Sequence, residues 1–159
     1  MLDFGFSYIG LIALLMLYIP NWIWVNHKPK DYEIYALGEN RVLLALERIG
    51  QVAVTVFALV SANLNIYELT PWIIWLILAF LVLIFYEIAW IRYFKSTRTM
   101  SDFYQSFLGI PVPLATLPIV GFLLLGIYGM SMPLIISSII LGIGHIGIHL
   151  NHLKEVRSL

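Results

Sequence analysis

The sequence predicts an all-α integral membrane protein, a five-transmembrane-helix bundle that forms a single domain over residues 1–159. Of its 159 residues, 61% are hydrophobic and 11% are charged, and the mean hydropathy is +0.92. A soluble domain of this length carries about 25% charged residues and cannot bury so much apolar surface. We therefore expect the lipid bilayer to be the main partner of this chain.

The composition also excludes several classes of function. The formal net charge is zero, so no basic patch points to a nucleic acid as partner. The chain has no cysteine, which excludes disulfides, thiolate metal sites and cysteine nucleophiles.

Five apolar segments are long enough to cross a bilayer as helices, which takes about 20 residues each. No internal repeat is visible, and the intervening segments are too short to form a separate domain. The predicted spans are approximately residues 4–25, 42–62, 71–93, 107–128 and 132–152.

The basic residues predict the orientation of these spans. With five spans, all nine Lys and Arg residues fall on one side of the membrane, in the loops after the first and third spans, at the start of the second span and in the tail. Because basic residues collect on the cytoplasmic side, we expect an outside N-terminus and a cytoplasmic C-terminus in the plasma membrane of a bacterial cell. The nine residues are Lys28, Lys30, Arg41, Arg48, Arg92, Lys95, Arg98, Lys154 and Arg157.

Local signals mark the beginnings and ends of the helices. The first span has no basic segment before it and no small-residue cleavage site after it, so we interpret it as a retained span and not as a signal peptide. Asn40 is the predicted cap of the second helix. Residues 99–106 are predicted to form a short interfacial helix before the fourth span, with Thr99 or Ser101 as its cap. The segment 109–113 and Pro118 predict that the cytoplasmic end of the fourth span is kinked or unwound.

The fifth span carries three of the four histidines. Steps of four and three residues connect Ser138, Gly142, His145, His149 and His152, so these residues share one face of a helix. A polar face on an otherwise apolar helix turns towards protein and away from lipid.

Three spans place ionisable side chains at a similar depth. With a rise of about 1.5 Å per residue, Glu47 lies roughly 7 Å, Glu87 roughly 9 Å and His145 roughly 10 Å inside the cytoplasmic boundary. An isolated charge in hydrocarbon costs several kcal/mol, so we expect these groups to face one another. The surrounding polar network is predicted to contain Asn40, Arg48, Gln51, Arg92 and Asn151.

The spacing of His145 and His149 gives the first functional hypothesis, a metal-assisted membrane enzyme or a metal-binding protein. Histidines four residues apart on a helix can bind one ion, and we expect one divalent ion, zinc or iron. The candidate ligands are His145, His149 and His152, and Glu47 or Glu87 would be a further ligand or the general base. Four histidines are too few for an eight-histidine di-iron site.

Two alternatives remain open at this stage. The same layer of Glu, His and Gln side chains could relay protons or bind a polar ligand in a small transporter or proton-coupled module. Alternatively, Glu47, Arg48, Glu87 and Arg92 form ion pairs that only fix helix packing in a structural or regulatory subunit. A homo-oligomer or a partner membrane subunit fits either alternative, and nothing in the sequence indicates a substrate.

Overall fold

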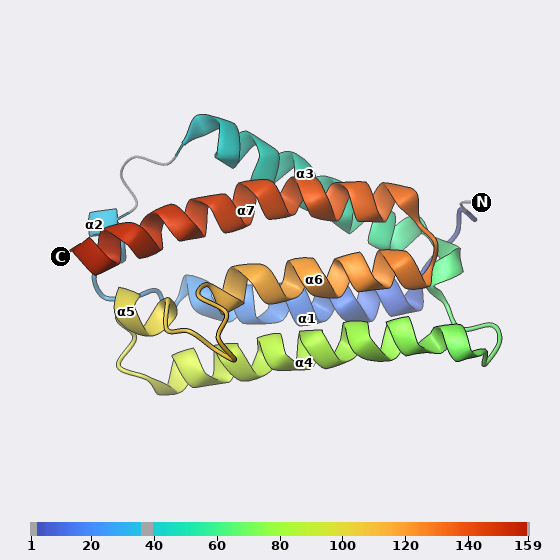
Figure 1. The fold of residues 1–159 in the computed structure, drawn as a ribbon, viewed down its shortest axis with the longest axis horizontal. Coiled ribbons are helices and arrows are strands. Elements are labelled where there is room, and N and C mark those ends of the chain that lie inside the picture. The colour runs from blue at the N-terminus through green and yellow to red at the C-terminus, as the bar shows by residue number, and fades with distance from the viewer. Residues whose placement is uncertain (1–2, 36–39, 159) are drawn as a thin grey trace.

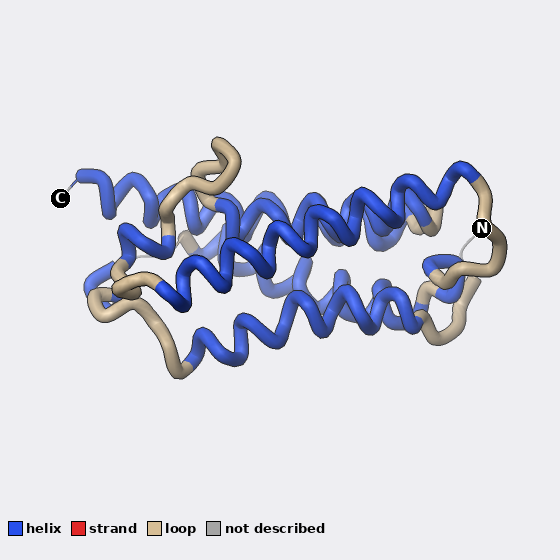
Figure 2. Tube along the Cα trace, turned by 90° about the horizontal axis from the view of Figure 1, so that it is seen from below, coloured by secondary structure: helices blue, strands red, loops and turns tan. Residues whose placement is uncertain are grey.

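Five long helices lie side by side in the computed structural model, which describes residues 3–35 and 40–158 (Figure 1). They are α1 (Tyr8–Val25), α3 (Arg41–Val60), α4 (Ile74–Lys95), α6 (Pro113–Tyr128) and α7 (Met132–Ser158). Figure 2 shows them as rods along the long axis, with the loops gathered towards the two ends. The short elements are α2 (Tyr32–Tyr35), α5 (Met100–Phe103) and two 3-10 turns, η1 (Ala62–Leu64) and η2 (Pro71–Ile73).

The prediction of an all-helical membrane bundle is confirmed, with a difference in the fourth predicted span. The described chain forms no β-strand, and four of its helices are long and apolar enough to cross a membrane: α1, α3, η2 with α4, and α7. α6 is apolar but has only 16 residues. Its length of about 24 Å is less than the hydrocarbon thickness of about 30 Å.

A turn explains why α6 starts later than the sequence predicts. Phe107 and Ile110 exchange backbone hydrogen bonds of 3.1 and 2.9 Å. Between them, Leu108 and Gly109 have φ angles of 52° and 80°, which are not helical. The helix then begins with Pro113, whose fixed φ and missing N–H suit a first helical position. The unwinding expected at 109–113 therefore takes the form of an ordered turn.

α6 lies in the middle of the bundle. It packs against α4 on one side and α7 on the other. Its Ile119, Phe122 and Leu125 are buried in the main apolar core. α6 therefore exposes little of its own surface, although it is the shortest of the five long helices.

α3 and α7 pack backbone against backbone at two glycines. A Cβ atom added at Gly50 would lie 2.4 Å from the backbone nitrogen of Leu141, and one at Gly144 would lie 2.3 Å from that of Glu47. Only a residue without a side chain allows backbones to pack at this distance. This contact brings the turn of α3 that carries Glu47 against the part of α7 that carries the histidines.

The predicted helix caps are present. The Asn40 side chain accepts hydrogen bonds from the backbone of Val42 and Leu43 at the start of α3. Thr99 caps α5 in a capping box with Asp102. A short helix does precede the fourth span, but it ends at Phe103 and does not extend over residues 99–106 as predicted.

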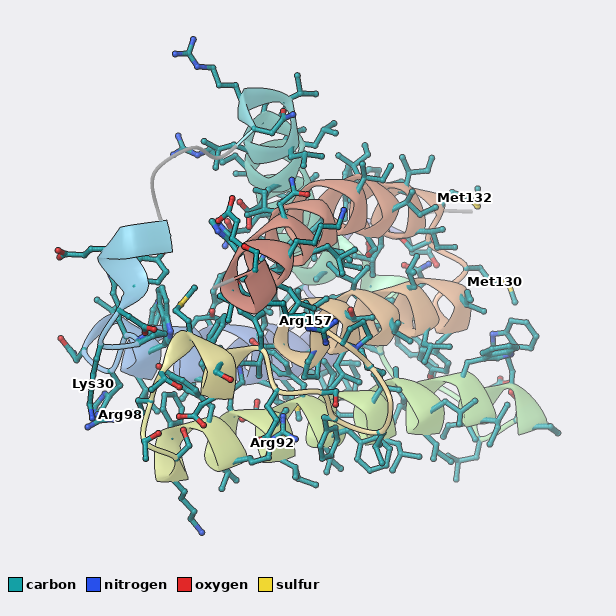
Figure 3. All side chains as sticks on the ribbon, turned by 60° about the vertical axis from the view of Figure 1, so that its left-hand side comes forward. Lys30, Arg92, Arg98, Met130, Met132 and Arg157 are labelled. Atoms are coloured by element: carbon teal, nitrogen blue, oxygen red, sulfur yellow. The ribbon has the colours of Figure 1, made fainter. Side chains whose placement is uncertain are left out.

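All nine basic residues belong to one end of the bundle. We call this end, which holds α2, α5 and the C-terminal turns of α7, the basic end (Figure 1). In Figure 3 the labelled basic side chains lie towards this end, whereas Met130 and Met132 lie at the opposite end.

Candidate functional site

Glu47 of α3 and His145 of α7 are in direct contact. Nδ1 of His145 is hydrogen-bonded to Oε1 of Glu47, and the two side chains are 27% and 22% exposed, respectively. The contact depends on Gly144, because the backbone of Glu47 occupies the space where a larger residue would place its Cβ. We call this the Glu47–His145 pair.

A second histidine extends the pair towards the basic end. His149 lies one turn further along α7, and the ring centroids of His145 and His149 are 4.5 Å apart in an edge-to-face arrangement. Nδ1 of His149 is hydrogen-bonded to the hydroxyl of Tyr104 at 3.0 Å. Glu47, His145, His149 and Tyr104 therefore form a row from α3 to the end of α5, with a hydrogen bond at each end and a ring contact between the two histidines.

Two cavities lie on either side of the Glu47–His145 pair, which contributes to the walls of both. The larger cavity has a volume of about 310 Å³ and receives residues from all five long helices. The smaller cavity, of about 230 Å³, lies towards the basic end and is lined by Tyr104, His149 and His152 among others. Asn21 and Trp24 of α1 also line both cavities.

Several polar side chains of the larger cavity are already hydrogen-bonded within the protein. The hydroxyls of Tyr18 and Thr55 are 2.6 Å apart. The Asn21 amide donates to the hydroxyl of Tyr86 at 2.8 Å and to the carbonyl of Leu17 at 2.6 Å. The remaining polar side chains on the cavity wall are the Glu47–His145 pair, Gln51 and the indoles of Trp22 and Trp24. A molecule in this cavity would therefore meet one ionisable pair in a mainly apolar and aromatic wall.

The structure brings together two of the three residues predicted to share one layer. Glu47 and His145 are in contact, whereas Glu87 lines neither cavity. Oε1 of Glu87 is buried and has no hydrogen-bond partner among residues 3–35 and 40–158. Its neighbour Tyr86 lines the larger cavity instead, so the two sequence neighbours on α4 project in different directions.

The other predicted site residues are dispersed. Gln51 is exposed and lines the larger cavity, and Asn40 caps α3. Arg92 donates hydrogen bonds to the carbonyls of Gln105 and Ser106 at 2.5 and 2.8 Å, and thereby fixes the segment after α5. Within the described part of the chain, neither Arg48 nor Arg92 forms an ion pair with a carboxylate. Arg48 and Asn151 are exposed.

The predicted metal ligands are only partly assembled. His152 lies 3.4 Å from the carboxylate of Glu155, on its own helix, and it also lines the smaller cavity. Where the chain is described, no three His, Cys, Asp or Glu side chains come together as a set that could hold a metal ion. A single divalent ion on His145 and His149 remains a prediction.

Asn21, Tyr86 and Tyr104 also line the cavities, although they are not among the predicted site residues. Asn21 carried a signal, because it is a polar residue about one turn inside the predicted end of the first span. Tyr86 and Tyr104 carried none, since tyrosines are common near membrane interfaces for reasons unrelated to a site.

No family model matches this chain, and no curated protein or solved structure matches it significantly.

Proposed function

We propose that this protein binds a small molecule inside the membrane and couples that binding to a proton on the Glu47–His145 pair, as a small transporter or proton-coupled module would. The observation that carries the proposal is the position of the pair in the wall between the two cavities. An ionisable pair at such a position can sense both a ligand on one side and protons on the other.

The pair has two charge states in which the same hydrogen bond persists. With Glu47 ionised, the bonded Nδ1 of His145 must be the donor in both states, because a carboxylate can only accept. With a proton on Nε2, imidazolium and carboxylate sum to zero charge; without it, the pair carries one negative charge.

A route for this proton leads to the basic end. The His145 ring contacts that of His149, and His149 is hydrogen-bonded to Tyr104 beside the smaller cavity. Histidine and tyrosine side chains can each both donate and accept a proton, so this row can pass one on.

The same proposal includes five crossings with the N-terminus outside and the C-terminus in the cytoplasm. The collection of all nine basic residues at one end supports this orientation. α6 and the turn at 107–112 would together form the fourth of the five crossings, surrounded by neighbouring helices. The cavities and the proton route would then open towards the cytoplasm.

Single cysteines test the orientation without background, because the chain contains none. Met132→Cys and Ser158→Cys place exposed thiols at opposite ends of α7. With a membrane-impermeant maleimide on intact cells, we expect labelling of the first variant only, and labelling of the second after permeabilisation. The reverse result would overturn the orientation.

A ligand panel tests the coupling. Purified protein would be screened by thermal shift at pH 6 and pH 8 against cationic, neutral and anionic aromatic compounds. We expect at least one ligand whose stabilising effect depends on pH in the wild type and not in Glu47→Gln. Glu68→Gln, which removes an exposed carboxylate outside both cavities, is the matched control. Ligands whose effect is independent of pH throughout would refute the coupling.

Metal analysis distinguishes this proposal from the metal hypothesis. Protein purified without chelators would be compared with His145→Ala/His149→Ala by elemental analysis. Stoichiometric zinc or iron that disappears in the variant would favour a metal-binding protein over a proton-coupled module.

A further inference from the structure

We infer that the two cavities together take an uncharged amphiphile, whose carbonyl-bearing polar end lies in the smaller cavity and whose alkyl chain lies in the larger one. This inference rests on the proposed function, because it names the ligand class of the same cavities. It follows from two buried N–H groups without an acceptor, from the charges around them and from the apolar wall beyond them.

Two indole N–H groups in the wall of the smaller cavity lack an acceptor. Trp24 of α1 and Trp90 of α4 both line this cavity, and the Nε1 atom of each is buried without a hydrogen-bond partner among the described residues. Trp90 is only 3% exposed, so its N–H is shielded from bulk water. An indole can donate a hydrogen bond but cannot accept one. A buried donor without a partner is unfavourable, and a ligand with an acceptor atom would relieve this.

The nearby tyrosines do not satisfy these two donors. The Tyr86 hydroxyl lies near the N–H of Trp90, and the Tyr93 hydroxyl lies near that of Trp24. Neither contact has the geometry of a hydrogen bond. Both hydroxyls are held elsewhere: that of Tyr86 accepts from the Asn21 amide at 2.8 Å, and that of Tyr93 donates to a backbone carbonyl at 2.7 Å.

The two indoles belong to one part of the cavity wall. Both contact the ring of Phe103, at centroid distances of 6.0 Å for Trp24 and 5.9 Å for Trp90, and Phe103 lines the same cavity. A carbonyl oxygen has two lone pairs and no proton, so it can accept from either N–H or from both. The polar end of the ligand therefore needs an oxygen acceptor and no donor of its own.

The charges around the smaller cavity favour an uncharged ligand. Glu47 lines both cavities and would repel an anion. Nζ of Lys28 lies 5.5 Å from the ring centroid of Trp24 and 5.4 Å from that of Tyr32, so the aromatic faces that would attract a cation already hold one. The three histidines of the wall add no negative charge that would favour a cation. A neutral ligand also avoids the cost of carrying a charge into the bilayer.

The larger cavity suits an alkyl chain. Its volume of about 310 Å³ lies at the lower end of the range for small-molecule sites. The apolar part of its wall contains Leu17, Ile119, Phe122 and Leu141. Trp24 lines both cavities, so one molecule with its carbonyl beside this indole can extend its chain into the larger cavity. Gln51, at the exposed edge of the larger cavity, can both donate and accept and therefore does not oppose such a ligand.

The indole N–H groups can report the binding directly. The chain has five tryptophans, so protein labelled with nitrogen-15 in micelles gives five indole signals in a proton–nitrogen correlation spectrum. Trp22→Phe, Trp72→Phe and Trp75→Phe, all outside the smaller cavity, identify their own signals and leave those of Trp24 and Trp90. Methyl dodecanoate would be titrated beside dodecane, which has no acceptor, and beside the charged probes dodecyltrimethylammonium and dodecanoate.

We expect methyl dodecanoate to move the Trp24 and Trp90 signals downfield in a saturable way, because both N–H groups gain an acceptor. Dodecane should cause no downfield shift, and the two charged probes should bind at least about tenfold more weakly. Equal downfield shifts with dodecane, no binding of the ester, or tighter binding of either charged probe would overturn the inference. These titrations use the wild-type chain, so the conclusion does not depend on whether a variant folds.

Two variants locate the polar end. Trp90→Phe keeps an aromatic ring but removes the N–H, and we expect it to weaken binding of methyl dodecanoate roughly fivefold. Trp75→Phe, on the same helix but outside both cavities, is the matched control and should bind as the wild type does. Equal affinity in both variants would show that the Trp90 N–H does not hold the ligand.

The pH dependence separates this inference from the proposed function. Methyl dodecanoate does not ionise between pH 6 and pH 8, so any change in its affinity over this range belongs to the protein. If the ester binds as expected but equally at both pH values, the inference stands and the proton coupling fails. If instead a charged compound of the ligand panel binds with a pH dependence that Glu47→Gln removes, the proposed function stands and the ligand class is wrong.

Discussion

Gly144→Ala is the sharpest test of how the Glu47–His145 pair is built. The added Cβ would lie 2.3 Å from the backbone nitrogen of Glu47 and 2.6 Å from the backbone oxygen of Leu43, about 1 Å short of ordinary contact. Backbone atoms cannot move aside by a rotamer change, so α3 and α7 must separate. Overpacking costs about 1–3 kcal/mol, and we take the upper end here. Alanine restores about 1 kcal/mol of helix propensity, which leaves a net loss of about 2 kcal/mol.

Gly147→Ala is the matched control, three residues further along the same helix. Its Cβ would meet only side-chain atoms of Leu43, the nearest at 3.1 Å, and these can shift. We therefore expect a free energy of unfolding equal to or above that of the wild type. Both variants would be unfolded with SDS in mixed micelles and followed by far-ultraviolet circular dichroism. If Gly144→Ala is as stable as Gly147→Ala, the backbone contact between α3 and α7 is not as close as described.

The remaining predictions concern residues outside the cavities. Glu87→Gln should not lower stability in the same unfolding assay, because the carboxylate has a buried oxygen without a described partner and no described ion pair to lose. Asn40→Ala should cost about 1 kcal/mol by removing the cap of α3. Hydrogen bonds from Thr97 and Thr99 lower the pKa of Asp102 below its ordinary value of 3.8. The ionised Asp102 therefore stabilises the fold above pH 3.8, and this stabilisation is lost as the pH falls through the lowered pKa. In Asp102→Asn, the free energy of unfolding should lose this dependence on pH.

The positions of Glu47 and His145 along their helices were enough to predict that the two side chains lie at a similar depth. Both α3 and α7 run without interruption through the layer concerned, so the rise of about 1.5 Å per residue gives their depth correctly. The glycines of α7 also indicated close packing, and Gly144 fulfils that role.

Depth alone could not place Glu87. A helix position has a direction as well as a depth, and α4 is apolar on nearly every side, so its sequence does not show which side faces the bundle. The structure buries Tyr86, Ala89, Trp90 and Tyr93, and Glu87 lies beside this buried surface. For the span at 107–128, the glycine and prolines of 109–113 did predict an irregular start, but they did not show that all six residues before Pro113 precede the helix.

The larger cavity is bordered by α1, α3, α4, α6 and α7 together, and this has a practical consequence for handling the protein. Whatever fills that space touches every long helix, so its binding free energy is added to the free energy that holds the bundle together. A ligand at a hundred times its dissociation constant adds about 2.7 kcal/mol. Shelf life in detergent and yield on purification should therefore rise when the right compound is present, and a simple heat-precipitation screen becomes a way to find that compound.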